Sequence, residues 1–157
     1  MSQVQKLWNT TAAIPLVGTR AFSFLFSQKA PYFATIRPRF TLIEANHVEL
    51  VIRKRRRVHN HLKTVHAIAL CNGLEAAMGA LAEVSIPRDK RWIPKGMDVT
   101  YTAKATSDIT CIAATDPAQW AGDDPDLHVR VRGEREDGVV VIEGVIRLWV
   151  TERPGAK

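Results

Sequence analysis

The sequence predicts an α+β fold in which one antiparallel sheet of about six strands wraps around a single buried helix. Residues 67–82 carry this prediction first, because apolar side chains occupy nearly every side of the helix that they would form. Such a helix is usually enclosed by other structure. The segments before and after it alternate apolar and polar residues with the period of a β-strand. A sheet curled around one helix accounts for both observations.

Composition favours one globular domain. The chain of 157 residues is long enough for a single core, and 46% hydrophobic with 24% charged residues is an ordinary balance. Cys71 and Cys111 both lie in apolar segments without disulfide or zinc-site spacing, which favours reduced thiols. The apolar run 21–26 is too short to span a bilayer and lacks the flanks of a signal peptide. We therefore expect a cytoplasmic protein with no membrane span.

The chain is predicted to begin with a helical segment, residues 1–30. Residues 3–10 and 18–30 have helical character, and Pro15 and Pro31 mark boundaries. Phenylalanines at positions 22, 24 and 26 either pack on the sheet or cover part of a binding channel.

Two strands are predicted between this segment and the central helix, with a turn at Ala45-Asn46. The first starts near Ala34, and its proline suits a strand at the edge of a sheet. Their inward faces are expected to consist of Ile36, Pro38, Phe40 and Leu42 in the first strand, and of Val48, Leu50 and Ile52 in the second.

Four strands are predicted after the helix, where residues 87–94 form a proline-bounded connection. Asp137-Gly138 is a strong hairpin signal, and residues 116–126 read as a loop. The strands are expected at residues 97–106, 109–115, 127–132 and 139–150. Residues 31–152 would then form a single domain, followed by a flexible tail, 153–157.

One basic run supplies much of the net charge of +6, namely Arg53-Lys-Arg-Arg-Arg57. Strand alternation would place Arg53, Arg55 and Arg57 on one face and the other two cations on the opposite face. The run suits a nucleic acid, an anionic cofactor or substrate, or merely a solvated strand end. Nucleic acid is the least favoured partner, because no aromatic residues are interleaved with the charges.

A carboxylate lies within the apolar helix at Glu75. A buried carboxylate has to be paired, shifted in pKa or used in chemistry. Glu75 is therefore a candidate catalytic residue, although a structural ion pair or hydrogen-bond network is the competing interpretation.

The order of elements and the run Asn60-His-Leu-Lys-Thr-Val-His66, with Glu75 nine residues later, resemble the hotdog fold over about residues 30–152. In particular they resemble its branch of phenylacetic-acid-degradation-type acyl-CoA thioesterases. The stretch Pro31–Ile36 and the run 60–75 are closest to a largely uncharacterised sub-branch of that superfamily.

The resemblance implies hydrolysis of an acyl-CoA or acyl-carrier thioester without a further cofactor. Glu75 would act as general base or nucleophile, and the backbone N–H of Ala67 would polarise the thioester carbonyl. His66 and Asn60 would hold the loop and the carbonyl in place. Plainer roles are a helix cap for His66 and a turn for Asn60.

Spacing along the helix points to an assembly. Nine helical residues rise about 13 Å and turn by about two and a half revolutions, so His66 and Glu75 of one chain cannot meet at one thioester. A working site would need Glu75 from one subunit and residues 60–66 from another. We therefore expect a homodimer, with a tetramer as the possible larger assembly.

Several alternatives stay open at this stage. The family's usual glycine pair after the histidine is Ala67-Ile68 here, which favours a non-catalytic acyl-CoA or lipid-binding module, and the family's usual loop glycine is Thr64. Histidines at positions 59, 61 and 66, without a nearby carboxylate or cysteine, make a metal site improbable. The cations Arg53, Arg55 and Arg57 would suit the phosphates of coenzyme A. The acyl group is not specified.

Overall fold

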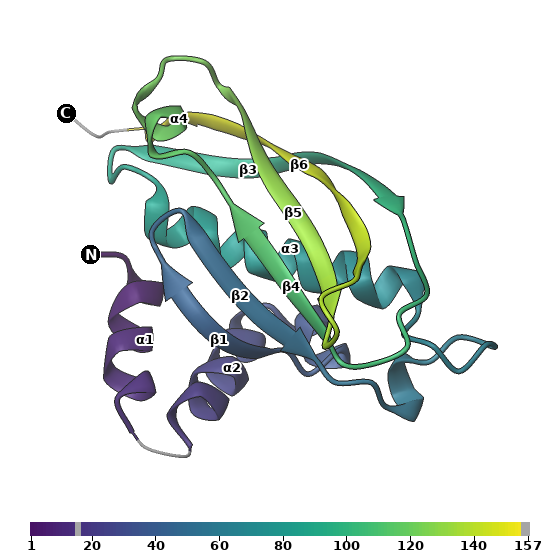
Figure 1. Ribbon diagram of the computed structural model, residues 1–157. Helices are drawn as coiled ribbons and strands as arrows, with labels where there is room; N and C mark the ends of the chain where they lie inside the picture. Colours follow the sequence, from purple (N-terminus) through teal and green to yellow (C-terminus); the bar gives the residue numbers. More distant parts are fainter. Residues whose placement is uncertain (15–16, 155–157) are drawn as a thin grey trace.

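The computed structural model describes residues 1–14 and 17–154 (Figure 1). The helices are α1 (Gln3–Ala12), α2 (Gly18–Lys29), α3 (Ala67–Ser85) and α4 (Pro117–Ala121), with 3₁₀ turns η1 (Pro31–Thr35) and η2 (Arg56–Val58). The strands are β1 (Arg39–Glu44), β2 (His47–Ile52), β3 (Lys90–Tyr101), β4 (Ile109–Ala114), β5 (Asp126–Arg135) and β6 (Val140–Glu152). Of the predicted tail, residues 155–157 lie outside the described residues.

All six strands form one antiparallel sheet in the order β1-β2-β4-β5-β6-β3, which leaves β1 and β3 at its edges. The sheet curls over α3, which runs across its concave side (Figure 1). The predicted α+β architecture, with two strands before the helix and four after it, is confirmed.

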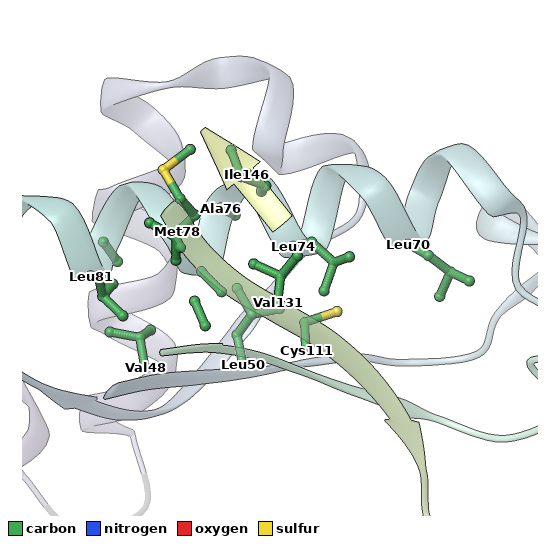
Figure 2. Close-up of a cluster of buried hydrophobic side chains, with 14 of the residues drawn as sticks. Val48, Leu50, Leu70, Leu74, Ala76, Met78, Leu81, Cys111, Val131 and Ile146 are labelled. Carbon is green, nitrogen blue, oxygen red and sulfur yellow. The ribbon is translucent and has the colours of Figure 1, made fainter. Parts of the chain in front are cut away.

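The core lies between α3 and the middle of the sheet. Leu70, Leu74 and Leu81 point from α3 towards the strands that carry Leu50 and Cys111 (Figure 2). The predicted inward residues of β2 are fully buried, namely Val48, Leu50 and Ile52. By length and composition alone α3 could cross a membrane, but 56% of its most apolar window is buried in the protein, as in a core helix.

Coverage of the sheet by α3 is uneven. The helix packs on β1, β2, β4 and β5 and makes few contacts with β6. Two side-chain hydrogen bonds join the edge strand β3 to α3, Trp92 Nε1 to Glu83 Oε1 at 3.0 Å and Tyr101 Oη to Cys71 Sγ at 3.3 Å. Within a single chain, α3 therefore leaves much of β3 uncovered.

The N-terminal helices pack at the opposite edge, beside β1 (Figure 1). Phe22 is fully buried, with its ring centroid 5.1 Å from that of Trp8 and 5.3 Å from that of Phe40. The Phe40 N–H of β1 donates to the Ser23 hydroxyl at 2.9 Å. Both predicted helices are present, and Phe24 points to solvent, so the three phenylalanines do not act as one surface.

The first predicted strand is partly wrong. Residues 31–35 form η1, so β1 begins only at Arg39. A bulge between Phe40 and Leu42 shifts the register and turns Ile43 into the core in place of Leu42. A bulge inserts one residue into the alternation, which a strict period of two cannot anticipate.

The connection predicted at residues 87–94 is also wrong, since β3 begins at Lys90 and ends at Tyr101 rather than near residue 106. An edge strand tolerates Pro94, particularly beside the bulge between Pro94 and Gly96. The predicted loop 116–126 contains α4, whose start has a capping box of Asp116 and Gln119.

Candidate functional site

The start of α3 presents backbone donors to its surroundings. His66 is the N-cap residue, and its Nδ1 accepts a hydrogen bond from the Ile68 N–H at 3.1 Å. The neutral imidazole then carries its proton on Nε2, which makes that atom a donor. Within the part of the chain that the structure describes, the Ala67 N–H has no acceptor. A free N–H at the positive end of a long helix can bind an anionic or polarised oxygen.

The loop before α3 is held by Asn60. Its Oδ1 accepts from the N–H groups of Leu62 and Thr64 at 2.9 and 3.2 Å, and its Nδ2 donates to Thr64 Oγ1 at 2.9 Å. Lys63 sits in the left-handed region at φ 60°, where the turn reverses. The Asn60 amide is therefore engaged within its own loop, and it positions the helix start rather than facing open space.

Glu75 lies exposed on the side of α3 that faces away from the sheet. Among the described residues its carboxylate has no hydrogen-bond or ion-pair partner. The expectation that the helix would be enclosed on all sides is wrong for the single chain, because Ile68, seven residues earlier on the same stripe, is also 57% exposed. A helix buried by one sheet face keeps its opposite side open unless another element covers it.

A cavity of about 960 Å³ opens beside Glu75. It runs along the second half of α3, past Gly79 and Glu83, with the C-terminal end of α2 and the start of α1 on one side and Trp92 of β3 on the other. Its size is within the range of small-molecule sites.

A smaller cavity of about 180 Å³ lies at the start of α3, between η1 and η2. Asn72, only 6% exposed, lines it and donates from Nδ2 to Thr35 Oγ1 at 3.1 Å. Its Oδ1 and the Nε2 of His59 are buried without a partner among the described residues. Our reasoning from the sequence did not single out Asn72, although an amide side chain within an apolar helix is a signal for a buried polar group.

The basic run does not continue the strand. β2 ends at Ile52 and η2 begins at Arg56, so the alternation predicted for Arg53, Arg55 and Arg57 is wrong beyond the strand end. Arg53 lies near Asp108, with Nε to Oδ2 at 3.7 Å, and the Arg55 guanidinium donates to the Thr35 carbonyl at 3.2 Å.

These arginines therefore differ in how well they could bind an anion. Burial, with Arg37 and Arg57 nearby, lowers the pKa of Arg55. Arg57 is exposed at the small cavity, within reach of an anion bound at the helix start. Of the three predicted phosphate-binding cations, it is the one whose charge is least engaged within the chain.

The two cysteines have different surroundings. Cys111 is fully buried under α3, and burial raises the pKa of its thiol. Cys71 lies on the open side of the helix, and its hydrogen bond with Tyr101 is the main cause that raises the pKa of that tyrosine to about 12.

Comparison with known proteins places the chain in a family. Residues 18–150 match the model of the family described as a domain of unknown function, DUF4442. A crystal structure of a structural-genomics target is 37% identical, with a TM-score of 0.84 over 96% of this chain and 99% of that chain. A search of curated proteins finds no match.

More distant structures share the fold. A Pseudomonas aeruginosa protein of unknown function, described as a probable thioesterase, is 22% identical, with a TM-score of 0.74 over 89% of this chain and 97% of that chain. A thioesterase from Haemophilus influenzae is 9% identical, with a TM-score of 0.71 over 88% of this chain and 94% of that chain. The fold is thus the hotdog fold that these structures share, and the chain itself belongs to the family of this domain of unknown function, DUF4442.

Proposed function

We propose that the protein hydrolyses an acyl thioester of coenzyme A or of an acyl-carrier protein, at two sites shared between the subunits of a homodimer. The observation that carries the proposal is the arrangement on α3 of a free N–H at Ala67 and an exposed carboxylate at Glu75. These are the two groups that thioester hydrolysis needs, a donor for the carbonyl oxygen and a base for water.

A second copy of the chain supplies what a single chain lacks. Ala67 and Glu75 are eight residues apart, so they are separated by about 12 Å along the helix axis. The long edge strand β3 has a neighbour on one side only, and an uncovered edge of this length readily pairs with another strand. A two-fold dimer through this edge would bring Glu75 of one chain towards the Ala67 N–H of the partner subunit.

The proposed reaction is balanced without a cofactor. Glu75 takes a proton from water while the water oxygen attacks the thioester carbon, and the negative charge that develops on the carbonyl oxygen is stabilised by the Ala67 N–H. The carbon–sulfur bond then breaks, sulfur keeps the electron pair, and the thiolate takes the proton from Glu75. The products are a carboxylic acid and a free thiol. Direct attack by Glu75 would instead expel the thiolate and give a mixed anhydride, and where water opens this anhydride at the Glu75 carbonyl carbon, ¹⁸O from labelled water would enter the Glu75 carboxylate.

The similar fold of proteins described as thioesterases supports this reaction class. Arg57, exposed near the helix start, supports an anionic carrier, since guanidinium groups bind phosphates by charge-assisted hydrogen bonds. Arg55 would offer an anion fewer free N–H donors, because its guanidinium already donates to a backbone carbonyl.

The first experiment measures release of free thiol from short, medium, long-chain and aromatic acyl-CoAs. Glu75→Gln removes the base and should lower kcat by about 10²- to 10⁴-fold while the protein stays folded. Glu44→Gln is the matched control, because Glu44 is exposed at the end of β1 and does not line the cavity beside Glu75. Equal turnover by wild type and Glu75→Gln would refute the role of Glu75.

A second experiment tests whether the site is shared. Ala67→Pro removes the backbone N–H of residue 67. Proline is tolerated at the first position of a helix when the residue before it is extended, and His66 is extended, with φ −64° and ψ 140°. Each variant alone should be inactive. Co-refolded in equal amounts, Ala67→Pro and Glu75→Gln should recover about a quarter of wild-type activity, because half of the dimers are mixed and each mixed dimer has one intact site. No recovery from mixed dimers would exclude a site built from two chains.

A non-catalytic acyl-CoA-binding module is the second candidate. The exposed Ile68 side chain beside the Ala67 N–H favours it, because it crowds the approach of a carbonyl. Tight binding of acyl-CoA by a folded dimer, without thiol release at any chain length, would select this function.

A further inference from the structure

The large cavity beside Glu75 is built by two parts of the chain. The hotdog core contributes one side of α3 and Trp92 of β3, whereas residues before β1 contribute the opposite wall. The wall residues that face the cavity include Val4 of α1, Phe26 of α2 and Phe33 of η1. The N-terminal helices thus complete a cavity that the core alone would leave open.

Much of the lining of this cavity is apolar. Its larger apolar side chains are those of Phe26, Phe33, Met78, Val84, Ile86 and Trp92. The Phe26 and Phe33 rings stack with centroids 5.9 Å apart, and Phe26 is braced in turn by Phe40 at 4.7 Å. Such a rigid aromatic wall keeps its shape when the cavity is empty, which is typical of a preformed binding site.

The charged side chains of the lining are those of Lys29, Glu75, Glu83, Arg88 and Arg153. Lys29 and Arg153 already donate hydrogen bonds, to Gln3 Oε1 at 2.9 Å and to the Lys90 carbonyl at 3.1 Å. Glu83 accepts from Trp92 Nε1. The carboxylate left without a partner among the described residues of this lining is Glu75. An occupant would therefore be an apolar body whose reactive end lies at Glu75.

The length of the cavity along α3 limits the length of its occupant. From Glu75 to Val84 the helix rises by about 13 Å. An extended hydrocarbon chain with bonds of about 1.5 Å advances by about 1.3 Å per carbon, so the cavity accommodates about ten carbons.

We propose that this cavity holds the acyl chain of the substrate, that the substrate class is a medium-chain acyl thioester of about ten carbons, and that the N-terminal helices form one wall of the acyl site. The inference rests on the proposed function, because it takes Glu75 as the position of the thioester. An acyl chain in the cavity contacts the aromatic wall, and each buried methylene strengthens binding about fourfold.

Gly79 is the natural position for a test. It lines the cavity one turn after Glu75, and a Cβ atom there would meet only Trp92, at an ordinary contact distance of 3.7 Å. Alanine, valine and leucine at this position would add increasing volume to the cavity, and the Cβ atom that all three share meets no backbone atom outside the helix within 4 Å. Ala121→Leu, at an exposed position at the end of α4, adds the same leucine away from the cavity.

The experiment measures both binding and turnover for acetyl-, hexanoyl-, decanoyl- and hexadecanoyl-CoA. Binding by calorimetry uses the Glu75→Gln protein, so that it does not depend on hydrolysis. We expect affinity to rise by about fourfold per methylene up to about ten carbons and then to level off. Gly79→Leu should lower the ratio of decanoyl to acetyl affinity, and the same ratio of kcat/KM, by tenfold or more. Gly79→Ala should have a smaller effect, and Ala121→Leu should leave both ratios unchanged.

The possible outcomes separate the two proposals. Chain-length profiles that stay parallel in Gly79→Leu would overturn the acyl cavity and leave the thioesterase function standing. Decanoyl binding that depends on Gly79, without thiol release from wild type, would support the cavity and refute hydrolysis. Dissociation of the dimer by Gly79→Leu, with the ratio unchanged, would mean that a second copy of the chain fills the cavity, and would overturn the inference.

Discussion

The two sides of α3 differ in burial and in chemistry. Towards the sheet, Leu74 and Leu81 are fully buried and belong to the core (Figure 2). On the opposite side Ile68 is exposed, the Glu75 carboxylate has no partner among the residues that the structure describes, and Gly79 borders a cavity. One side of a single helix therefore holds the fold together, and the other is available for a ligand and a second chain. A substitution on the side that faces the sheet should therefore lower the stability of the fold, whereas a substitution on the opposite side should impair ligand binding or dimerisation.

The largest effect on stability is expected on the side of α3 that faces the sheet. Leu74→Ala removes a fully buried side chain and should lower the free energy of unfolding by about 2–5 kcal/mol, from lost burial and a residual cavity. Urea denaturation followed by circular dichroism measures it. The loss should not depend on protein concentration; if it did, Leu74 would be acting through the assembly.

On the open side, Ile68→Asp should weaken the dimer by about 2 kcal/mol or more, or about 30-fold in the dissociation constant. The new charge would lie on the stripe of Glu75 and face the same partner. Sedimentation velocity over a range of concentrations gives the constant. A wild-type chain that stays monomeric at micromolar concentration would contradict the shared site as a whole.

The same glycine-to-alanine substitution can be made on both sides of α3, at Gly73 and at Gly79. A Cβ at Gly73 would lie 2.4 Å from Ile52 Cδ1 and 2.8 Å from Cys111 Sγ, so Gly73→Ala should cost about 1–3 kcal/mol through overpacking. Gly79→Ala has room and should stabilise the helix by about 0.5–1 kcal/mol. Thermal unfolding of both variants measures the difference, and equal costs would mean that the open side is as tightly packed as the core.

The smallest effect is a titration on the open side. Tyr101 has its pKa raised to about 12, first by the hydrogen bond with Cys71 and then by burial. Because the folded value lies above the ordinary value of 10.0, the stability that this bond contributes is complete below pH 10 and is lost as the pH rises through about 12.

The absorbance of ionised tyrosine follows this change, and Tyr101→Phe identifies the step. Cys71→Ala should move the Tyr101 pKa towards 10.0. A wild-type step already at that value would show that the hydrogen bond does not form in solution.

Local patterns were enough to predict the elements that one sheet face buries. Val48, Leu50 and Ile52 alternate with polar residues, and β2 places all three in the core. The helical spacing of apolar residues after His66 likewise predicted α3 within a few residues of its observed end. Errors arose where a single residue breaks the period, at the bulge after Phe40 and at Pro94 within an edge strand. A bulge depends on pairing with a strand elsewhere in the chain, so no local pattern contains it.

The candidate site likewise has features that the sequence predicted and features that it did not. The sequence by itself determined the helix, its start at Ala67 and the carboxylate at Glu75, because spacing along one helix is a local property. Tertiary structure alone decided that Glu75 is exposed, that the Asn60 amide is engaged within its own loop, and that Asn72 lines a second cavity. The physical reason is that exposure depends on which elements pack around a helix, and those elements come from distant parts of the sequence.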